Sequence, residues 1–127
     1  IEQIFGGSER ETFVGDTNVK ILGGTVTRRI YGGCYNEYTG TWKTRHHVGG
    51  NLTVFLSSNA NIVIDSSFDD TGIFACTRYG SHYDDENSTI VFEDSAAKTK
   101  FEGLLGQQTG WIQSKWCSAA KNYVVQG

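Results

Sequence analysis

Short apolar runs, most of them alternating with polar residues, recur along the chain up to about Val91. Three of these runs are Asn18–Leu22, Leu52–Leu56 and Thr89–Glu93, and shorter ones follow the first two at Thr25–Thr27 and Ile62–Ile64. β-Branched and aromatic residues with a period of two favour strands that are buried on one face. Because Gly, Asp and Ser-Asn clusters separate the runs, the pattern predicts a mainly β protein with frequent turns.

A phrase made of isoleucine, an aromatic residue and two small residues precedes each long run. It reads Ile4-Phe5-Gly6-Gly7, then Ile30-Tyr31-Gly32-Gly33, and a third copy, Ile73-Phe74-Ala75-Cys76, lacks the glycine pair. An ordered unit that repeats along a chain is typical of proteins whose segments stack on one another. We expect the glycine pair to form the turn between stacked strands, because Gly adopts backbone conformations that other residues resist.

The last third of the chain has a different character. Asp94 or Ser95 can cap a helix from Ser95 to Leu105, and Gly106 stops it. The apolar residues Ala97, Phe101, Leu104 and Leu105 fall on one face of that helix. We expect residues 1–94 to form the repeats, residues 95–127 to form a cap of the same domain, and Tyr123–Val125 to add a last short strand.

Two segments, Thr17–Val26 leading to Ile30–Gly33, and Val48–Leu56, resemble the glycine-rich β-helical repeats of large secreted or surface-anchored proteins of gut bacteria. The resemblance covers roughly residues 1 to 75 and implies an extracellular or cell-surface location. With the repeats, it predicts an all-β, right-handed parallel β-solenoid of about five turns with a C-terminal capping helix. A two-sheet β-sandwich is the alternative, since short strands with glycine turns also describe sandwiches.

Composition excludes several classes of partner. A net charge of −3, with 20% charged residues, lacks the basic field that nucleic acid or an anionic membrane attracts. No apolar run approaches the roughly 20 residues of a transmembrane helix. We therefore expect neither nucleic-acid binding nor membrane insertion. Because the chain of 127 residues starts at Ile1 and contains no Met, we expect one domain of a larger protein with flanking domains.

Three cysteines, Cys34, Cys76 and Cys117, have no metal-ligand spacing. Cys34 and Cys76 occupy nearly equivalent places in the second and third phrases, so stacking would permit a disulfide between them. Buried thiols are the favoured interpretation, because cysteine packs well as a small apolar side chain. The sequence predicts neither a metal nor another cofactor.

Aromatic and basic residues are concentrated in a segment that begins in the second phrase and continues after it. They are Tyr31, Tyr35, Tyr38, Trp42, Arg45, His46 and His47. Flat rings stack on the apolar faces of sugars, and polar neighbours bind hydroxyl groups. Tyr35, Tyr38, Trp42 and His47 are therefore the predicted glycan-binding residues. The alternative is that Tyr31 and Trp42 pack against the body of the protein.

Two acidic clusters offer a rival chemistry. Asp65, Asp69 and Asp70 form one, and Asp84-Asp85-Glu86-Asn87 forms the other. Neither follows a calcium-loop pattern, and solvated turns are the favoured interpretation. Paired carboxylates can also cleave glycosidic bonds, and no nucleophile elbow is present. The rival hypothesis is a polysaccharide-cleaving lyase or glycoside hydrolase that uses Asp69, Asp70, His82 and Asp84.

The favoured function is a non-catalytic extracellular or cell-surface module that acts as a structural spacer, an adhesin or a glycan binder. Glycans, or other ligands on a host or cell surface, would be its partners. We expect no catalytic residues under this hypothesis, and the aromatic segment after the second phrase is the surface to test.

Overall fold

The computed structural model describes residues 1–7, 15–35, 47–63, 72–78, 84–108 and 117–127. The strands in these ranges are β1 (Gln3–Phe5), β2 (Thr17–Ile21), β3 (Thr25–Val26), β4 (Arg29–Tyr31), β5 (Leu52–Leu56), β6 (Asn61–Ile62), β7 (Gly72–Phe74), β8 (Ser88–Phe92), β9 (Gln107–Gln108), β10 (Cys117–Ser118) and β11 (Asn122–Val125). The helices are η2 (Asp85–Asn87), α2 (Ser95–Phe101) and η3 (Glu102–Leu104).

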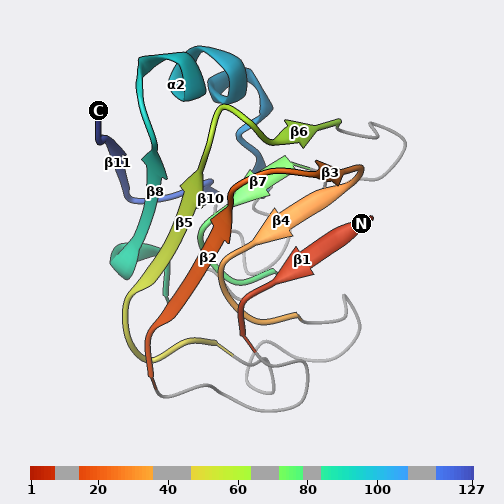
Figure 1. Cartoon of the computed structure of the whole chain (residues 1–127). Coiled ribbons are helices and arrows are strands. Elements are labelled where there is room, and N and C mark those ends of the chain that lie inside the picture. The colour runs from red at the N-terminus through yellow and green to blue at the C-terminus, as the bar shows by residue number, and fades with distance from the viewer. Residues whose placement is uncertain (8–14, 36–46, 64–71, 79–83, 109–116) are drawn as a thin grey trace.

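Three parallel sheets form the body of the protein (Figure 1). The largest has the order β11-β8-β5-β2, the second β1-β4-β7, and the smallest is the pair β3-β6. Successive strands move from sheet to sheet, because β2, β3 and β4 belong to the four-, two- and three-stranded sheets, and β5, β6 and β7 repeat this order. The antiparallel pair β9-β10 stands apart from this arrangement.

The repeated phrase lies in register across the second sheet. Ile4 pairs with Ile30, and Ile30 pairs with Ile73. The long runs also pair in order, because β5 lies between β2 and β8. The prediction that equivalent segments of the repeat stack on one another is therefore confirmed for these strands.

The predicted fold class is wrong. The parallel sheets do not close into a solenoid, and the chain winds through only two full passes before α2 follows β8. A third strand beside β6 would continue the winding, but Ser95–Phe101 contains good helix formers and forms α2 there instead. The fold is a small α/β-like arrangement of parallel sheets, not an all-β solenoid. The sandwich alternative is also wrong, since all three sheets of the body are parallel.

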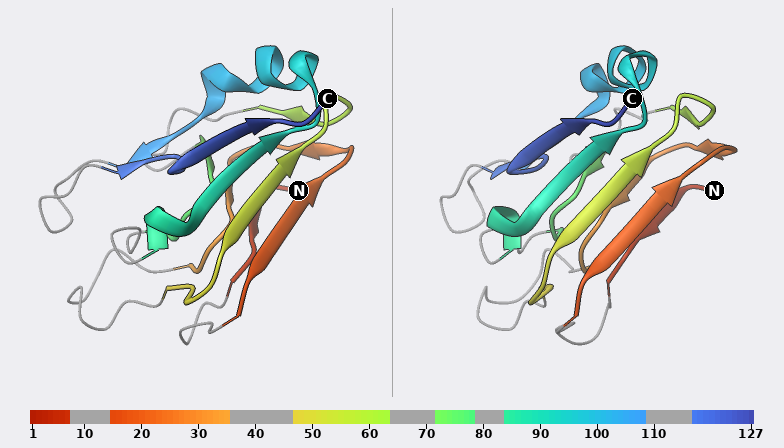
Figure 2. Two further views of the ribbon diagram at one scale, coloured as in Figure 1. Left: turned by 90° about the vertical axis from the view of Figure 1, so that its left-hand side faces the viewer. Right: turned by 60° about the vertical axis from the view of Figure 1, so that its left-hand side comes forward.

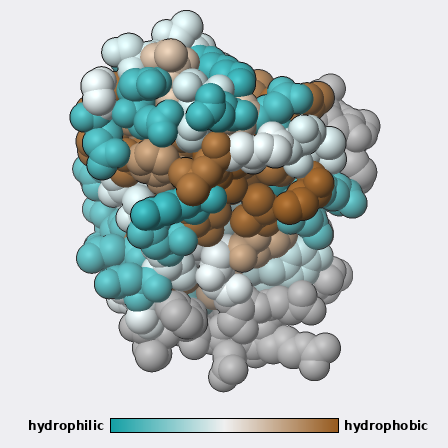
Figure 3. Space-filling view, viewed as in Figure 1, coloured by the Kyte–Doolittle hydropathy of each residue, from teal (hydrophilic) through white to brown (hydrophobic). Residues whose placement is uncertain are grey.

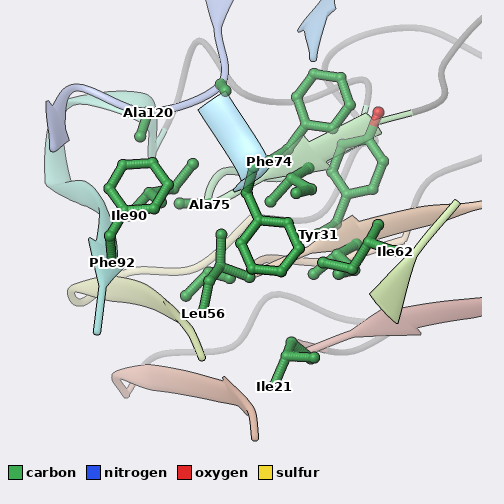
Figure 4. Close-up of a cluster of buried hydrophobic side chains, with 14 of the residues drawn as sticks. Ile21, Tyr31, Leu56, Ile62, Phe74, Ala75, Ile90, Phe92 and Ala120 are labelled. Carbon is green, nitrogen blue, oxygen red and sulfur yellow. The ribbon is translucent and has the colours of Figure 1, made fainter. Parts of the chain in front are cut away.

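A ladder of stacked rings crosses the core. The rings of Phe5 and Tyr31 are 5.4 Å apart between centroids, and those of Tyr31 and Phe74 are 4.4 Å apart. Figure 4 shows Tyr31 and Phe74 side by side, with Leu56 and Phe92 from the large sheet in the same cluster. The sheets therefore enclose a common core, and each copy of the repeated phrase contributes its aromatic residue to that core.

The glycine pairs of the phrase are needed for close stacking and not for unusual backbone angles. A Cβ atom on Gly6 would lie 2.5 Å from the carbonyl oxygen of Gly32, and one on Gly32 would lie 2.5 Å from that of Ala75. Among the glycines of the described ranges, positive φ angles occur only at Gly24 and Gly72. The expectation that the pair supplies special backbone conformations is therefore wrong, and the reason for glycine is space.

The predicted N-cap of the helix is confirmed at Asp94. Its carboxylate accepts a hydrogen bond from the backbone N–H of Ala97, and Ala97 and Phe101 are buried in the core. Lys100 Nζ donates to the carbonyl oxygens of Ser58 and Ala60, so the helix is tied to the β5–β6 turn. Among the described residues, no helix has the length and apolar character needed to cross a membrane.

Candidate functional site

The aromatic segment predicted to bind glycans is described at its two ends. Tyr38 and Trp42 lie outside the described residues. Tyr35 and His47 are the last described residues on either side of them, and both are half-buried. Tyr31 is fully buried between Phe5 and Phe74. The packing alternative is therefore confirmed for Tyr31, which belongs to the core.

Tyr35 packs against aromatic and cationic side chains. Its ring meets that of Phe5 edge-on, with 5.0 Å between centroids. The guanidinium of Arg78 lies 4.8 Å from the centre of the Tyr35 ring, and that of Arg29 lies 5.9 Å away. Both arginines are themselves nearly buried, so these cation–π contacts are partly shielded from water. Tyr35 is thus held firmly at the start of the segment.

Arg28 and Arg29 face different surroundings, as expected for adjacent strand residues. Arg28 forms an ion pair with Glu2 at 3.2 Å. Arg29 Nε donates a hydrogen bond of 2.8 Å to the side-chain oxygen of Gln3. Of these two arginines, Arg29 is the one whose guanidinium lies near the Tyr35 ring.

A buried hydrogen-bond network anchors both ends of the aromatic segment. One carboxylate oxygen of Asp84 accepts from the backbone N–H of Val48 at 3.0 Å and from the Thr77 hydroxyl. The other accepts from the backbone N–H of Thr77 at 3.1 Å. The Thr77 hydroxyl in turn accepts from the backbone N–H of Cys34 at 3.0 Å. Cys34 directly precedes Tyr35 and Val48 directly follows His47, so one network holds the residues on either side of the segment.

This anchor network is defined as Cys34, Val48, Thr77 and Asp84, and each of its members is at most 1% exposed. Burial makes each unpaired polar group costly, and the network gives every donor named above an acceptor. The favoured interpretation of the second acidic cluster as a solvated turn is therefore wrong for Asp84. It fits Glu86 and Asn87, which are exposed.

Burial raises the pKa of the Asp84 carboxyl above its ordinary value of 3.8. The hydrogen bonds from Thr77 and Val48 and the nearby charge of His47 act in the opposite direction but do not cancel it. Because all the hydrogen bonds described for Asp84 come from groups that support the fold, the carboxyl serves as a structural acceptor. A general acid or base must instead lie within hydrogen-bond reach of the substrate proton that it transfers.

The raised pKa of Asp84 predicts a pH dependence of stability. In the unfolded chain Asp84 ionises near pH 3.8, while in the folded protein it keeps its proton to a higher pH. Between these two pKa values the folded state binds more protons, so the free energy of unfolding decreases as pH rises. The contribution is fully present below the unfolded pKa and is lost as pH passes the folded one.

Urea titrations of the wild type and of Asp84→Asn, at pH values from about 4 to about 8, measure this effect. The free energy of unfolding of the wild type is expected to decrease more over this range than that of Asp84→Asn, which cannot ionise at this position. Parallel curves for the two proteins would show that Asp84 does not titrate across this range.

The remaining residues of the rival catalytic hypothesis, Asp69, Asp70 and His82, lie outside the described residues, as does Asp65. Among the residues that are described, no group of three His, Cys, Asp or Glu side chains is placed to hold a metal ion. Within the part of the chain that is described, the structure brings Asp84 together with Thr77, Cys34 and Val48.

Cys34 and Cys76 are both buried and both are thiols, not halves of a disulfide. The preference for buried thiols is confirmed for these two residues. The pairing of Tyr31 with Phe74 places Cys34 beside Thr77, and it places Cys76 beside Gly33. The two cysteines are therefore offset by one residue, which directs neighbouring side chains to different sides.

Thr77 is the member of the anchor network that sequence reasoning missed. It lies directly after the third phrase, but nothing in its local sequence distinguishes it from other threonines. Its partners Cys34 and Asp84 are 43 and 7 residues away along the chain. Only the stacked register of the second and third phrases brings them together.

Comparison with protein-family models, with curated proteins and with solved structures finds no match to this chain.

Proposed function

We propose that this chain is a non-catalytic binding module that presents its aromatic segment to a glycan. The observation that carries the proposal is the anchor network, which holds Cys34 and Val48 at the two ends of the segment. Binding residues are commonly placed on segments that a rigid scaffold positions. Here the scaffold is the body of parallel sheets, and the segment is the most aromatic and basic stretch of the sequence.

Tyr35, Tyr38, Trp42 and His47 remain the proposed ligand-binding residues. Tyr35 contributes through its half-buried ring, which the guanidinium groups of Arg29 and Arg78 hold in place. An extracellular or cell-surface location is part of the proposal, and the resemblance to secreted repeat proteins supports it. Asp84 is assigned to the scaffold, which removes one of the four residues that the polysaccharide-cleaving hypothesis needs.

A glycan array tests the proposal. The wild-type protein is expected to be retained on a subset of glycans. A Tyr38→Ala/Trp42→Ala double variant is expected to lose at least about fivefold in affinity, because each stacking ring contributes about 0.5 to 1.5 kcal/mol. The matched control is Tyr38→Phe/Trp42→Phe, which keeps two flat rings and should retain most of the binding.

Two outcomes would contradict the proposal. One is a wild-type protein that binds no glycan on a broad array. The other is the release of new reducing ends or unsaturated products from a polysaccharide panel, which would establish the polysaccharide-cleaving enzyme instead.

A further inference from the structure

The four-stranded sheet has an open strand at each edge. β11 forms one edge and β2 the other, and within the described ranges no strand pairs with the outer side of either (Figure 2). All strands of this sheet run parallel. The outer side of β2 can therefore add to the outer side of a β11 from another copy without reversing any strand direction.

The second sheet is stepped relative to the first. β2 and β4 belong to one pass of the chain, β5 and β7 to the next, and β8 and the residue Leu105, which bridges Ile73, to the third. β1 extends the second sheet one row beyond β2, and β11 extends the first sheet one row beyond β8. Each sheet therefore has four rows, and the steps at the two ends are complementary.

The third side of the molecule spans the same number of strand rows as the two larger sheets. It contains β3 and β6, followed by α2. A helix is about 10 Å across and a strand row about 4.8 Å, so α2 occupies about two rows. A copy displaced by four rows, about 19 Å, thus continues all three sides at once.

β11 extends rows of buried side chains in the large sheet, and its own side chains in these rows are exposed. Ile90 and Phe92 are at most 2% exposed, whereas their neighbours Tyr123 and Val125 in β11 are 47% and 42% exposed. At the opposite end Ile1 is 78% and Leu22 60% exposed, and Figure 3 shows hydrophobic surface gathered over β1 and the β2–β3 turn. Both ends therefore present apolar side chains that a neighbouring copy can cover.

The backbone at the two edges is also complementary. Gln126 N–H donates to the Phe92 carbonyl, so the alternation of a parallel strand directs the N–H and C=O groups of Tyr123 and Val125 away from β8. Ser57 N–H donates to the Ile21 carbonyl, so the same alternation directs those of Lys20 outward from β2. These are the groups that two joined edges would pair.

We propose that copies of this chain associate head to tail, with β2 of one copy added in parallel to β11 of the next. In the register of the existing sheet, Lys20 lies opposite Val124 and Val19 extends the ladder that ends at Tyr123. The aliphatic part of Lys20 covers Val124 while its ammonium group stays in water. The contact joins two different edges and repeats by displacement along the row direction, so it produces a linear assembly. Such an assembly repeats the aromatic segment along one line, but the contact does not depend on glycan binding.

Directed cross-linking tests the proposed contact. Lys20→Cys and Val124→Cys are made separately in a Cys117→Ser background and mixed under mild oxidation, because paired strand residues lie within disulfide range. The mixture is expected to give a cross-linked dimer, while each variant alone gives none. The double variant Lys20→Cys/Val124→Cys is expected to give a ladder of oligomers.

Other outcomes overturn the proposal. Cross-linking of Val124→Cys alone would indicate a two-fold contact between β11 strands, and cross-linking of Lys20→Cys alone one between β2 strands. The proposal is also overturned if the mixture remains uncross-linked and the wild type sediments as a monomer at every concentration. In that case another segment or another partner would cover these edges.

A proline variant separates assembly from folding. Val125→Pro removes only the outward N–H, so β11 keeps its pairing with β8 while the next copy loses a hydrogen bond and meets the proline ring. Its self-association constant is expected to fall at least about tenfold in sedimentation velocity. Val125→Thr, which keeps the N–H and the branched shape, is the matched control. Equal association of Val125→Pro and wild type, with unchanged circular dichroism, would overturn the proposal.

Discussion

Asp84→Ala is expected to lower the free energy of unfolding by about 3 to 5 kcal/mol. The carboxylate accepts from the backbone N–H groups of Val48 and Thr77 and from the Thr77 hydroxyl, and the residue is fully buried. Removing it leaves these donors without their acceptor, at about 1 to 3 kcal/mol for each buried group. Urea unfolding monitored by circular dichroism measures the change.

Glu86→Ala is the matched control for this variant. Glu86 lies two residues further along the same turn, is exposed, and makes only a surface ion pair of 3.8 Å with Lys121. Such pairs contribute little, so the control is expected to change the free energy of unfolding by less than about 1 kcal/mol. If the two variants were equally stable, the anchor network would have no special structural role.

Gly33→Ala is expected to destabilise the protein by about 2 to 3 kcal/mol. A Cβ at this position would lie 2.8 Å from the backbone Cα and N atoms of Thr77 and closer still to its hydroxyl. Backbone atoms cannot move aside without displacing the row, so the substitution overpacks the stack and disturbs the anchor network. Differences in the urea midpoint measure the effect.

Gly23→Ala tests whether the loss of stability in Gly33→Ala comes from the steric clash of the new Cβ or from the replacement of a glycine as such. Nothing lies within 4 Å of a Cβ at Gly23, and its φ is not positive. Alanine there is expected to be neutral or to stabilise the protein by up to about 1 kcal/mol, because it restricts the unfolded chain. A similar loss in both variants would contradict the explanation by close stacking.

These expectations connect stability with the proposed binding function. The network that Asp84 completes is also the one that holds the ends of the aromatic segment, through Cys34 and Val48. Loss of this acceptor should therefore loosen the presentation of the segment as well as the fold. The connection gives a structural reason for a buried carboxyl at this position, independent of any acid or base chemistry.

The strands were predictable because their signal is local. Leu52–Leu56 was predicted with its observed bounds, and Asn18–Leu22 differs from β2 by one residue at each end. Alternation and β-branched side chains act within a few residues, so they can be recognised without knowledge of the fold. The helix start at Asp94 was predictable for the same reason, since an N-cap bonds to a residue three positions away.

The error in fold class has an equally specific cause. The third pass has a phrase and a long strand but no counterpart of Thr25–Val26 or Asn61–Ile62, and α2 takes that place. The helix was recognised in the sequence but was assigned to the end of the stack. Which side of the fold a helix joins depends on tertiary contacts, here those of Ala97, Phe101 and Lys100.

The sequence alone was sufficient to identify the repeated phrase, the long strands and the start of the helix, since each depends on neighbours along the chain. Tertiary structure decided the burial of Cys34 and Cys76 as thiols, the burial of Asp84 and the hydrogen bonds of Asp84 to Thr77 and Val48. It also showed that the glycine pairs allow the backbones of neighbouring copies of the phrase to approach closely. These features depend on which residues face each other across rows, and a shift of one residue changes every such pair.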